Sequence, residues 1–228
     1  MAAKPLVVFD LDGTLVDTAP DLVGALNFVL AREGLNTIPL ERARKMIGAG
    51  ARRLIELGLE DDGRQIGPDD INRLTADFIA YYAEHIADES VPFDGLLAAL
   101  DELSARDYAF AVCTNKLEWL SLRLLERLDL THRFKAICGA DTFGVSKPDP
   151  IILRQTVARA GGNMASTIMV GDAGPDVGVA RRAGVPVIGV TFGYTEIPIA
   201  ELNPDIVIPH MTELPAAVEQ LLAASPTA

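Results

Sequence analysis

The chain has 228 residues, enough for one large domain or for one domain with a small insertion. Hydrophobic residues make up 49% of it, so the chain can build a sizeable core. The formal net charge of -12 argues against nucleic acid as a partner, because its phosphates would be repelled. The same charge means that an anionic substrate would need local positive charge from a metal, a lysine or helix N-termini.

The two cysteines, Cys113 and Cys138, each end an apolar run, and we expect buried free thiols in strands. They form no disulfide framework, which fits a reducing cytoplasm. No apolar stretch approaches the roughly 20 residues of a membrane span. Asp10 and Asp12 interrupt the first apolar run too early for a signal peptide. We therefore expect a cytoplasmic protein, a monomer or a homodimer, without a membrane partner.

The first predicted element is a strand at residues 5–9, an apolar run that indicates burial on both faces. Residues 18–88 then show helical spacing and nothing that reads as a strand. Helices are expected from about residue 20, over 40–47, over 51–59 and from 68. Thr18 is positioned to cap the first of them.

Strands and helices alternate in the rest of the chain. Strands are expected at 108–113, 136–138, 167–170, 185–190 and 206–208, and helices at about 95–106, 117–128, 149–160, 176–183 and from 212. Such alternation predicts right-handed βαβ units and a parallel sheet covered on both faces. We therefore predict an α/β core of residues 1–16 and 89–228, with residues 17–88 inserted as an all-helical domain.

Two carboxylates stand where the first strand ends. Residues two apart on a strand project the same way, so Asp10 and Asp12 would share one small volume, with Leu11 turned back into the core. Like charges this close are costly unless a cation neutralises them or one carboxyl keeps its proton. Gly13 lets the backbone turn sharply, and Thr14 adds a hydroxyl.

Three further strand ends carry polar groups. Thr114, Asn115 and Lys116 follow the second core strand, Lys147 follows the third after a loop, and Asp172 and Asp176 follow the fourth. Each segment also has a purely structural interpretation: Thr114 and Asn115 could cap a helix, Lys147 could lie in a solvated turn, and Asp172 and Asp176 could belong to a capped helix start. The carboxyl ends of parallel strands meet at one edge of a sheet, where such proteins bind their ligands. The order of these polar groups along the chain, after the Asp-x-Asp-Gly-Thr segment, therefore indicates phosphoryl-transfer chemistry.

With these motifs the sequence resembles phosphatases of the haloacid dehalogenase superfamily, and the resemblance covers essentially the whole chain. It implies a Rossmann-like, three-layer core in which the first strand lies between the second and the fourth. By the same resemblance, Asp10 is the nucleophile and Asp12 the general acid and base. Thr114, with the backbone of Asn115, would hold the phosphate, and Lys147 would support both phosphate and nucleophile.

The resemblance also implies a Mg²⁺ site. Asp10, Asp172 and the backbone carbonyl of Asp12 would bind the ion, and Asp176 would support the site. Carboxylate oxygens suit Mg²⁺, which also uses substrate phosphate as a ligand. The family often has serine where this chain has Ala173, so we expect a change in the tuning of the site rather than loss of activity.

The helical insertion follows the loop of the first strand, the C1 cap position of the family. Within that group the chain is similar to phosphoglycolate phosphatases, through residues 17–22, 47–50 and 191–194. Gly48 and Gly50 would let the backbone approach a substrate. At most one of Arg52 and Arg53 would face the pocket, and we assign Arg53, although both could instead be solvated surface residues. A small phosphorylated acid, 2-phosphoglycolate, is the expected substrate.

Three alternatives remain from the sequence. A sugar phosphatase or a phosphomutase of the same superfamily would share Asp10 and Asp12 and differ in the cap. A non-catalytic protein that binds a phosphorylated metabolite would keep the same groups without turnover. A hydrolytic dehalogenase is disfavoured, because that subgroup lacks the second aspartate.

Overall fold

The computed structural model describes residues 4–195 and 197–224. Its central element is a six-stranded sheet in the order β5-β4-β1-β6-β7-β8, in which every pairing is parallel. The strands are β1 (Leu6–Phe9), β4 (Ala109–Cys113), β5 (Ala136–Cys138), β6 (Thr167–Gly171), β7 (Val187–Val190) and β8 (Ile206–Ile208). The first strand therefore lies between the second and fourth core strands, as the resemblance implied.

β1 is buried on both faces, as its apolar run predicted. Val7 and Phe9 belong to the hydrophobic cluster on one face of the sheet, and Leu6 and Val8 to the cluster on the other. Alternate side chains of a strand point to opposite faces, so a central strand needs apolar residues at every position. The sheet therefore holds the end of β1 rigidly.

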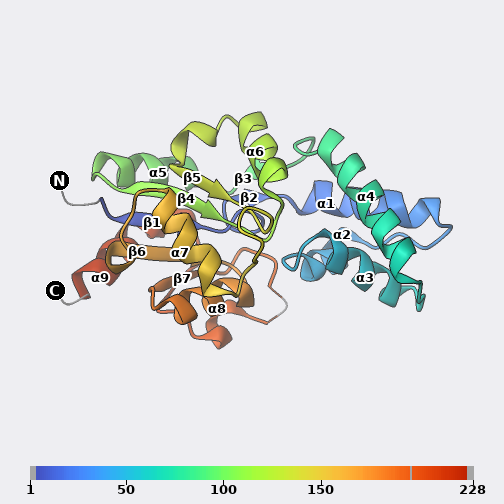
Figure 1. Ribbon diagram of the computed structural model, residues 1–228. Coiled ribbons are helices and arrows are strands. Elements are labelled where there is room, and N and C mark those ends of the chain that lie inside the picture. Colours follow the sequence, from blue (N-terminus) through green and yellow to red (C-terminus); the bar gives the residue numbers. More distant parts are fainter. Residues whose placement is uncertain (1–3, 196, 225–228) are drawn as a thin grey trace.

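Helices cover both faces of this sheet (Figure 1). One face carries α5 (Leu96–Ala105), α6 (Glu118–Arg127) and α9 (Leu214–Ala224), and the other carries α7 (Pro150–Arg159) and α8 (Gly174–Ala183). The result is the predicted three-layer α/β arrangement. We call the sheet with these five helices the core lobe.

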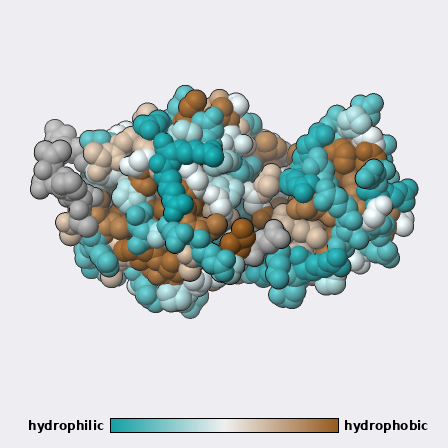
Figure 2. All heavy atoms as spheres, turned by 90° about the horizontal axis from the view of Figure 1, so that it is seen from below, coloured by the Kyte–Doolittle hydropathy of each residue, from teal (hydrophilic) through white to brown (hydrophobic). Residues whose placement is uncertain are grey.

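A second, helical lobe lies at the end of the molecule away from both termini (Figure 1). This helical lobe consists of α1 (Ala19–Arg32), α2 (Leu40–Ala43), α3 (Ala51–Asp61) and α4 (Pro68–Glu84). The described part of residues 18–88 contains no strand, as predicted. Figure 2 shows that the molecule narrows between the two lobes.

The predicted bounds agree with the observed ones to within two residues, except for the helix expected over 40–47. That helix stops at Ala43 and continues as a 3₁₀ turn, Arg44–Met46. Ile47 then turns extended, and Gly48 has φ +124°, a left-handed value that favours glycine. The two glycines around residue 49 therefore end the helix earlier than its apolar pattern indicates.

The two connections between the lobes lie side by side. β2 (Val16–Asp17) pairs antiparallel with β3 (Val91–Pro92), a pairing that the sequence did not predict because two-residue strands show no periodicity. The carboxylate of Asp21 accepts hydrogen bonds from the backbone N–H groups of Glu89 and Ser90, at 3.1 Å and 2.9 Å for the shortest contacts. These bonds fasten the start of α1 to the returning chain.

The prediction for the two cysteines also holds in the part of the chain that the structure describes. Cys113 and Cys138 are buried free thiols, each at the end of a strand. None of the described helices has both the length and the apolar character that a membrane crossing requires.

Candidate active site

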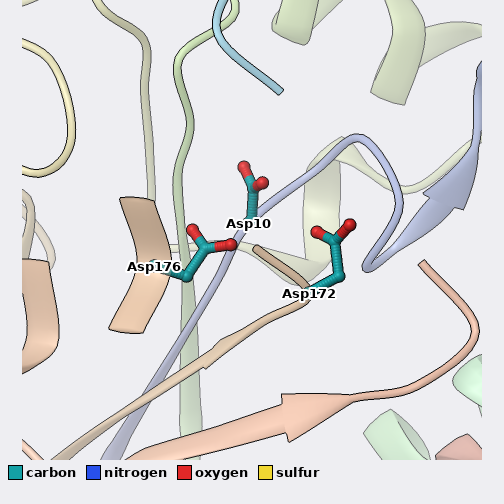
Figure 3. Close-up of side chains that lie close together, drawn as sticks. All are labelled: Asp10, Asp172 and Asp176. Atoms are coloured by element: carbon teal, nitrogen blue, oxygen red, sulfur yellow. The ribbon is translucent and has the colours of Figure 1, made fainter. Parts of the chain in front are cut away.

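Three buried carboxylates meet at the carboxyl edge of the sheet. Asp10 follows β1, Asp172 follows the neighbouring strand β6, and Asp176 lies in the first turn of α8. One oxygen from each lies within 4.8 Å of the other two, and the three side chains stand around one small space (Figure 3). The structure thus brings together the three carboxylates that the sequence proposed around a metal.

The charges of this cluster are not balanced by the protein alone. Burial and the carboxylates of Asp176 and Asp10 raise the pKa of Asp172 to about 8. Burial also raises the pKa of Asp10 to about 6, although Lys147 opposes the shift. Carboxylate oxygens held this close are the ligands that a hard divalent cation uses, and its charge would relieve their repulsion. The donor set therefore fits a metal ion.

Lys147 supplies the positive charge within the cluster. Its Nζ lies 2.8 Å from Oδ1 of Asp10 and donates a 2.6 Å hydrogen bond to Oδ1 of Asp176. Burial alone would lower the pKa of this lysine, but the two carboxylates raise it above its usual value. The side chain of Asn115 accepts a 2.8 Å hydrogen bond from the backbone N–H of Lys147 and so helps to hold its loop.

Asp172 is held in place from two sides. The hydroxyl of Thr14 donates to its Oδ1 at 3.0 Å, and the backbone N–H of Tyr194 donates to its Oδ2 at 2.7 Å. Gly13 has φ +84°, and a Cβ at this position would lie 2.6 Å from Oδ2 of Asp172. Glycine is therefore required here both for the turn and for the close approach.

Tyr194 also connects the cluster to the helical lobe, a link that the sequence did not reveal. Its hydroxyl donates to Oδ1 of Asp17 at 2.6 Å and accepts from the backbone N–H of Ala19 at 3.0 Å. Arg44 donates to the other oxygen of Asp17 at 2.9 Å. The loop after β7 thus touches Asp172 at one end and the start of α1 at the other.

Asp12 has partners of its own. Its carboxylate accepts hydrogen bonds from Oγ1 of Thr18 at 2.8 Å and from Nζ of Lys116 at 2.8 Å and 3.1 Å. Thr18 does not cap α1 with its side chain, contrary to our expectation. Its backbone angles, φ -95° and ψ -3°, are helical rather than the extended values of a capping residue, which leaves the hydroxyl free to bond Asp12.

Ala173 stands where the family often has serine. Its backbone N–H donates to Oδ2 of Asp176 at 3.0 Å. This contact does not depend on the side chain, so the alanine leaves Asp176 anchored.

A cavity of about 230 Å³ opens in front of Asp10 and Asp12, between the two lobes. Thr114, which is buried, and Asn115 line it from the core lobe. Gly48 from the helical lobe also lines it, and its carbonyl accepts a 3.4 Å hydrogen bond from the side chain of Asn115. The remaining lining residues are mostly apolar: Leu22, Ile47, Gly50, Ala51, Arg52, Leu54, Thr75, Phe78, Ile79, Tyr82, Lys116, Leu117 and Leu120.

The arginines of α3 differ from expectation. Arg53 does not line the cavity, because its side chain turns to Glu56 and Glu60 on the same helix. Arg52 does line it, but its guanidinium bonds Glu56 at 3.1 Å and Asn72 at 2.8 Å. Helix rotation decides which of two adjacent residues faces inward, and two neighbouring arginines give no sign of it.

Comparisons relate the chain to known proteins by sequence and by overall fold. The family described as haloacid dehalogenase-like hydrolase matches residues 7–190. Proteins named phosphoglycolate phosphatase from Agrobacterium fabrum and Caulobacter vibrioides are each 44% identical; the matches cover 96% of this chain and 95% and 93% of theirs. A crystal structure of a predicted phosphoglycolate phosphatase from Haemophilus somnus superposes with a TM-score of 0.86 at 27% identity, covering 95% of this chain and 99% of that one.

Proposed function

The chain belongs to the haloacid dehalogenase-like hydrolase family, and from this premise we propose that it is a Mg²⁺-dependent phosphatase acting on 2-phosphoglycolate. The observation that carries the proposal is the buried cluster of Asp10, Asp172 and Asp176 with Lys147 against it. The substrate is supported by relatives that carry the name phosphoglycolate phosphatase at 44% identity over nearly the whole chain.

In the first half of the reaction, a carboxylate oxygen of Asp10 attacks phosphorus. The bond between phosphorus and the ester oxygen breaks, and Asp12 gives its proton to the departing alkoxide. A carboxylate and a phosphate repel each other, and the Lys147 ammonium in contact with Asp10 offsets that repulsion. Mg²⁺ held by Asp10, Asp172 and the Asp12 carbonyl would supply further positive charge beside the transferring group.

In the second half, Asp12 takes a proton from water, and the water oxygen attacks the phosphorus of the aspartyl phosphate. The bond between phosphorus and Asp10 breaks, and inorganic phosphate leaves. Thr114 and the backbone of Asn115 bind the phosphoryl oxygens throughout. Asp12 therefore acts as acid and then as base, so its position relative to the ester oxygen matters in both steps.

We also propose that residues 17–88 act as a cap that closes over the substrate. Both lobes line the cavity. The paired strands β2 and β3 form a narrow connection about which the two lobes can move relative to each other. Small-angle scattering with and without a phosphate mimic is expected to show a smaller radius of gyration in the bound state. An identical shape in both states would contradict closure.

The size and lining of the cavity favour a small acid over a sugar phosphate. A volume of about 230 Å³ suits a small ligand, and its mostly apolar wall offers few partners for the hydroxyl groups of a sugar. A sugar phosphatase or phosphomutase would leave those hydroxyls without hydrogen bonds, which is costly for a buried ligand.

A screen of phosphomonoesters with Mg²⁺, ranked by kcat/KM, tests the proposal. We expect 2-phosphoglycolate to rank above neutral sugar phosphates, and the Asp10→Asn variant to show no turnover above background. Sugar phosphates with much higher kcat/KM would establish the alternative function. Binding of 2-phosphoglycolate without turnover of any ester, including an aryl phosphate, would indicate a binding protein instead.

A further inference from the structure

Lys116 is a buried lysine to which the sequence analysis gave no role. It follows β4, and only 8% of its surface is exposed. Its buried counterpart Lys147 is paired with Asp10 and Asp176, whereas Lys116 is paired with Asp12. Burying an ammonium costs free energy, so a second buried lysine beside the proposed acid and base suggests a function for its charge.

The ammonium of Lys116 has a donor to spare. It carries three N–H groups, and its hydrogen bonds within the described chain go to the two oxygens of Asp12. The ammonium also lies 4.5 Å from the ring centroid of Tyr82. This cation–π contact is favourable, but it provides no hydrogen-bond acceptor for the third N–H group. Because Lys116 lines the cavity, a ligand there can receive the remaining donor.

Tyr82 brings a second unused donor to the same place. Its side chain in α4 is fully buried and lines the cavity, and its hydroxyl has no hydrogen-bond partner among the described residues. Burial, with the charges of Asp12 and Asp21, raises the pKa of this phenol well above its usual value, so it stays protonated. Buried hydroxyls without partners are uncommon, and one beside a ligand cavity is suited to donate to the ligand.

Among the described residues that line the cavity, no other cation is as well placed. Of these described residues Arg52 is the only other basic one, and its guanidinium is already bonded to Glu56 and Asn72. Its side chain is also 53% exposed, so water screens its charge. An anionic group of a ligand would therefore bind more strongly at Lys116.

We propose that Lys116 and Tyr82 form the binding site for the carboxylate of the leaving group, with Lys116 giving the charge and Tyr82 a hydrogen bond. This inference rests on the proposed function. In that reaction Asp12 faces the ester oxygen, and one carbon separates this oxygen from the carboxylate carbon of 2-phosphoglycolate. Lys116 touches Asp12, so the spacing suits a short acid and not a longer one.

Two substrates of nearly equal size separate carboxylate recognition from general catalysis. Ethyl phosphate has the same chain as 2-phosphoglycolate with a methyl group in place of the carboxylate. We expect Lys116→Met to lower kcat/KM for 2-phosphoglycolate relative to ethyl phosphate by roughly 10- to 100-fold, the range of a charge-assisted hydrogen bond. The matched control Lys135→Gln, which removes an exposed lysine of the core lobe, is expected to leave the ratio unchanged.

Tyr82→Phe tests the same site without removing a charge. It deletes a hydroxyl that bonds nothing in the described protein, so the melting temperature is expected to stay the same or rise. The ratio of the two kcat/KM values is expected to fall by roughly 5-fold. An unchanged ratio would overturn the role of Tyr82, and this variant remains informative if Lys116→Met does not fold.

The outcomes for the two proposals are distinct. An equal loss for both substrates in Lys116→Met would show that this lysine acts only through Asp12, and would overturn carboxylate binding. If the wild-type protein turned over ethyl phosphate with the same kcat/KM as 2-phosphoglycolate, the proposed function would instead be contradicted. The wild type is also expected to prefer 2-phosphoglycolate to the analogue with one more methylene before the carboxylate; the reverse preference would contradict the spacing.

Discussion

At one end of the candidate active site the core lobe places three buried carboxylates and Lys147, on loops that follow strands of the sheet or at the start of α8. At the other end, the cavity is walled mostly by apolar side chains, and α1, α3 and α4 of the helical lobe supply much of that wall. We call these the phosphate end, defined by Asp10, Asp172, Asp176 and Lys147, and the leaving-group end, defined by the cavity.

The contrast separates what must be fixed from what can vary. In the proposed reaction, charges at the phosphate end act on a group that every phosphomonoester shares, and they need precise placement. The leaving-group end would contact the part by which substrates differ. Because much of its wall comes from inserted helices, side chains there can change without moving the strands. Substitutions at the phosphate end are therefore expected to lower the turnover of every phosphomonoester, whereas substitutions at the leaving-group end are expected to change which phosphomonoester is preferred.

The largest effect is expected at Asp10. Asp10→Asn keeps the shape of the side chain and removes its charge, so it can neither attack phosphorus effectively nor pair with Lys147. We expect kcat to fall by about 10⁴-fold or more, for 2-phosphoglycolate and ethyl phosphate alike. Steady-state kinetics, with circular dichroism to confirm folding, measure this. Near-normal turnover by the folded variant would rule out nucleophilic attack by Asp10.

A change in pH should affect the stability of the metal-free protein through the phosphate end. In the unfolded chain Asp172 has its ordinary pKa of 3.8, whereas in the folded protein the pKa is about 8. The folded state therefore binds more protons between these values, and stability falls as pH rises through that window. The raised pKa of Asp10, about 6, acts in the same direction.

With EDTA present, we expect the melting temperature to fall by about 4 °C or more between pH 5 and pH 8. Asp172→Asn should flatten this dependence, and Mg²⁺ should raise the wild-type melting temperature at pH 8. EDTA should also abolish turnover, and Mg²⁺ should restore it. A melting temperature that rises with pH without metal, or full activity in EDTA, would contradict the assigned cluster.

The smallest effect is expected at the link between the two ends. Tyr194→Phe removes the hydroxyl that bonds Asp17 and Ala19 but keeps the backbone N–H that holds Asp172. We expect a loss of about 1–3 kcal/mol in unfolding free energy and a change in kcat of less than about 10-fold. Tyr108→Phe, whose hydroxyl lies near Arg106 and Glu219 in the core lobe, is the control. Equal effects of the two variants on stability would argue against the link.

The phosphate end could be predicted from the sequence because Asp10 and Asp172 directly follow strands, and Lys147 and Asp176 lie on the loop and the helix start that come after strands. Once the strands are parallel and β1 is central, Asp10 and Asp172 must lie near each other at one edge. Gly13 could be identified in the same way, since a sharp turn after the strand requires it.

The leaving-group end could not be predicted to the same degree. The contact between Lys116, which follows β4, and Tyr82 depends on how α4 packs over the core lobe, and no local spacing encodes that packing. For the same reason the sequence could not show that Arg53 turns away from the cavity. Thr18 occupies a capping position in sequence, but its hydroxyl bonds Asp12 in the folded protein.

The central claim is that the phosphate end forms a covalent bond to substrate through Asp10. The most direct measurement uses ³²P-labelled 2-phosphoglycolate with Mg²⁺, rapid acid quenching, and borohydride reduction of the trapped protein followed by peptide mass spectrometry. We predict that the label appears on the protein within one turnover and that Asp10 alone is converted to homoserine. Full turnover with no label on the protein, or modification at any other residue, would contradict the account.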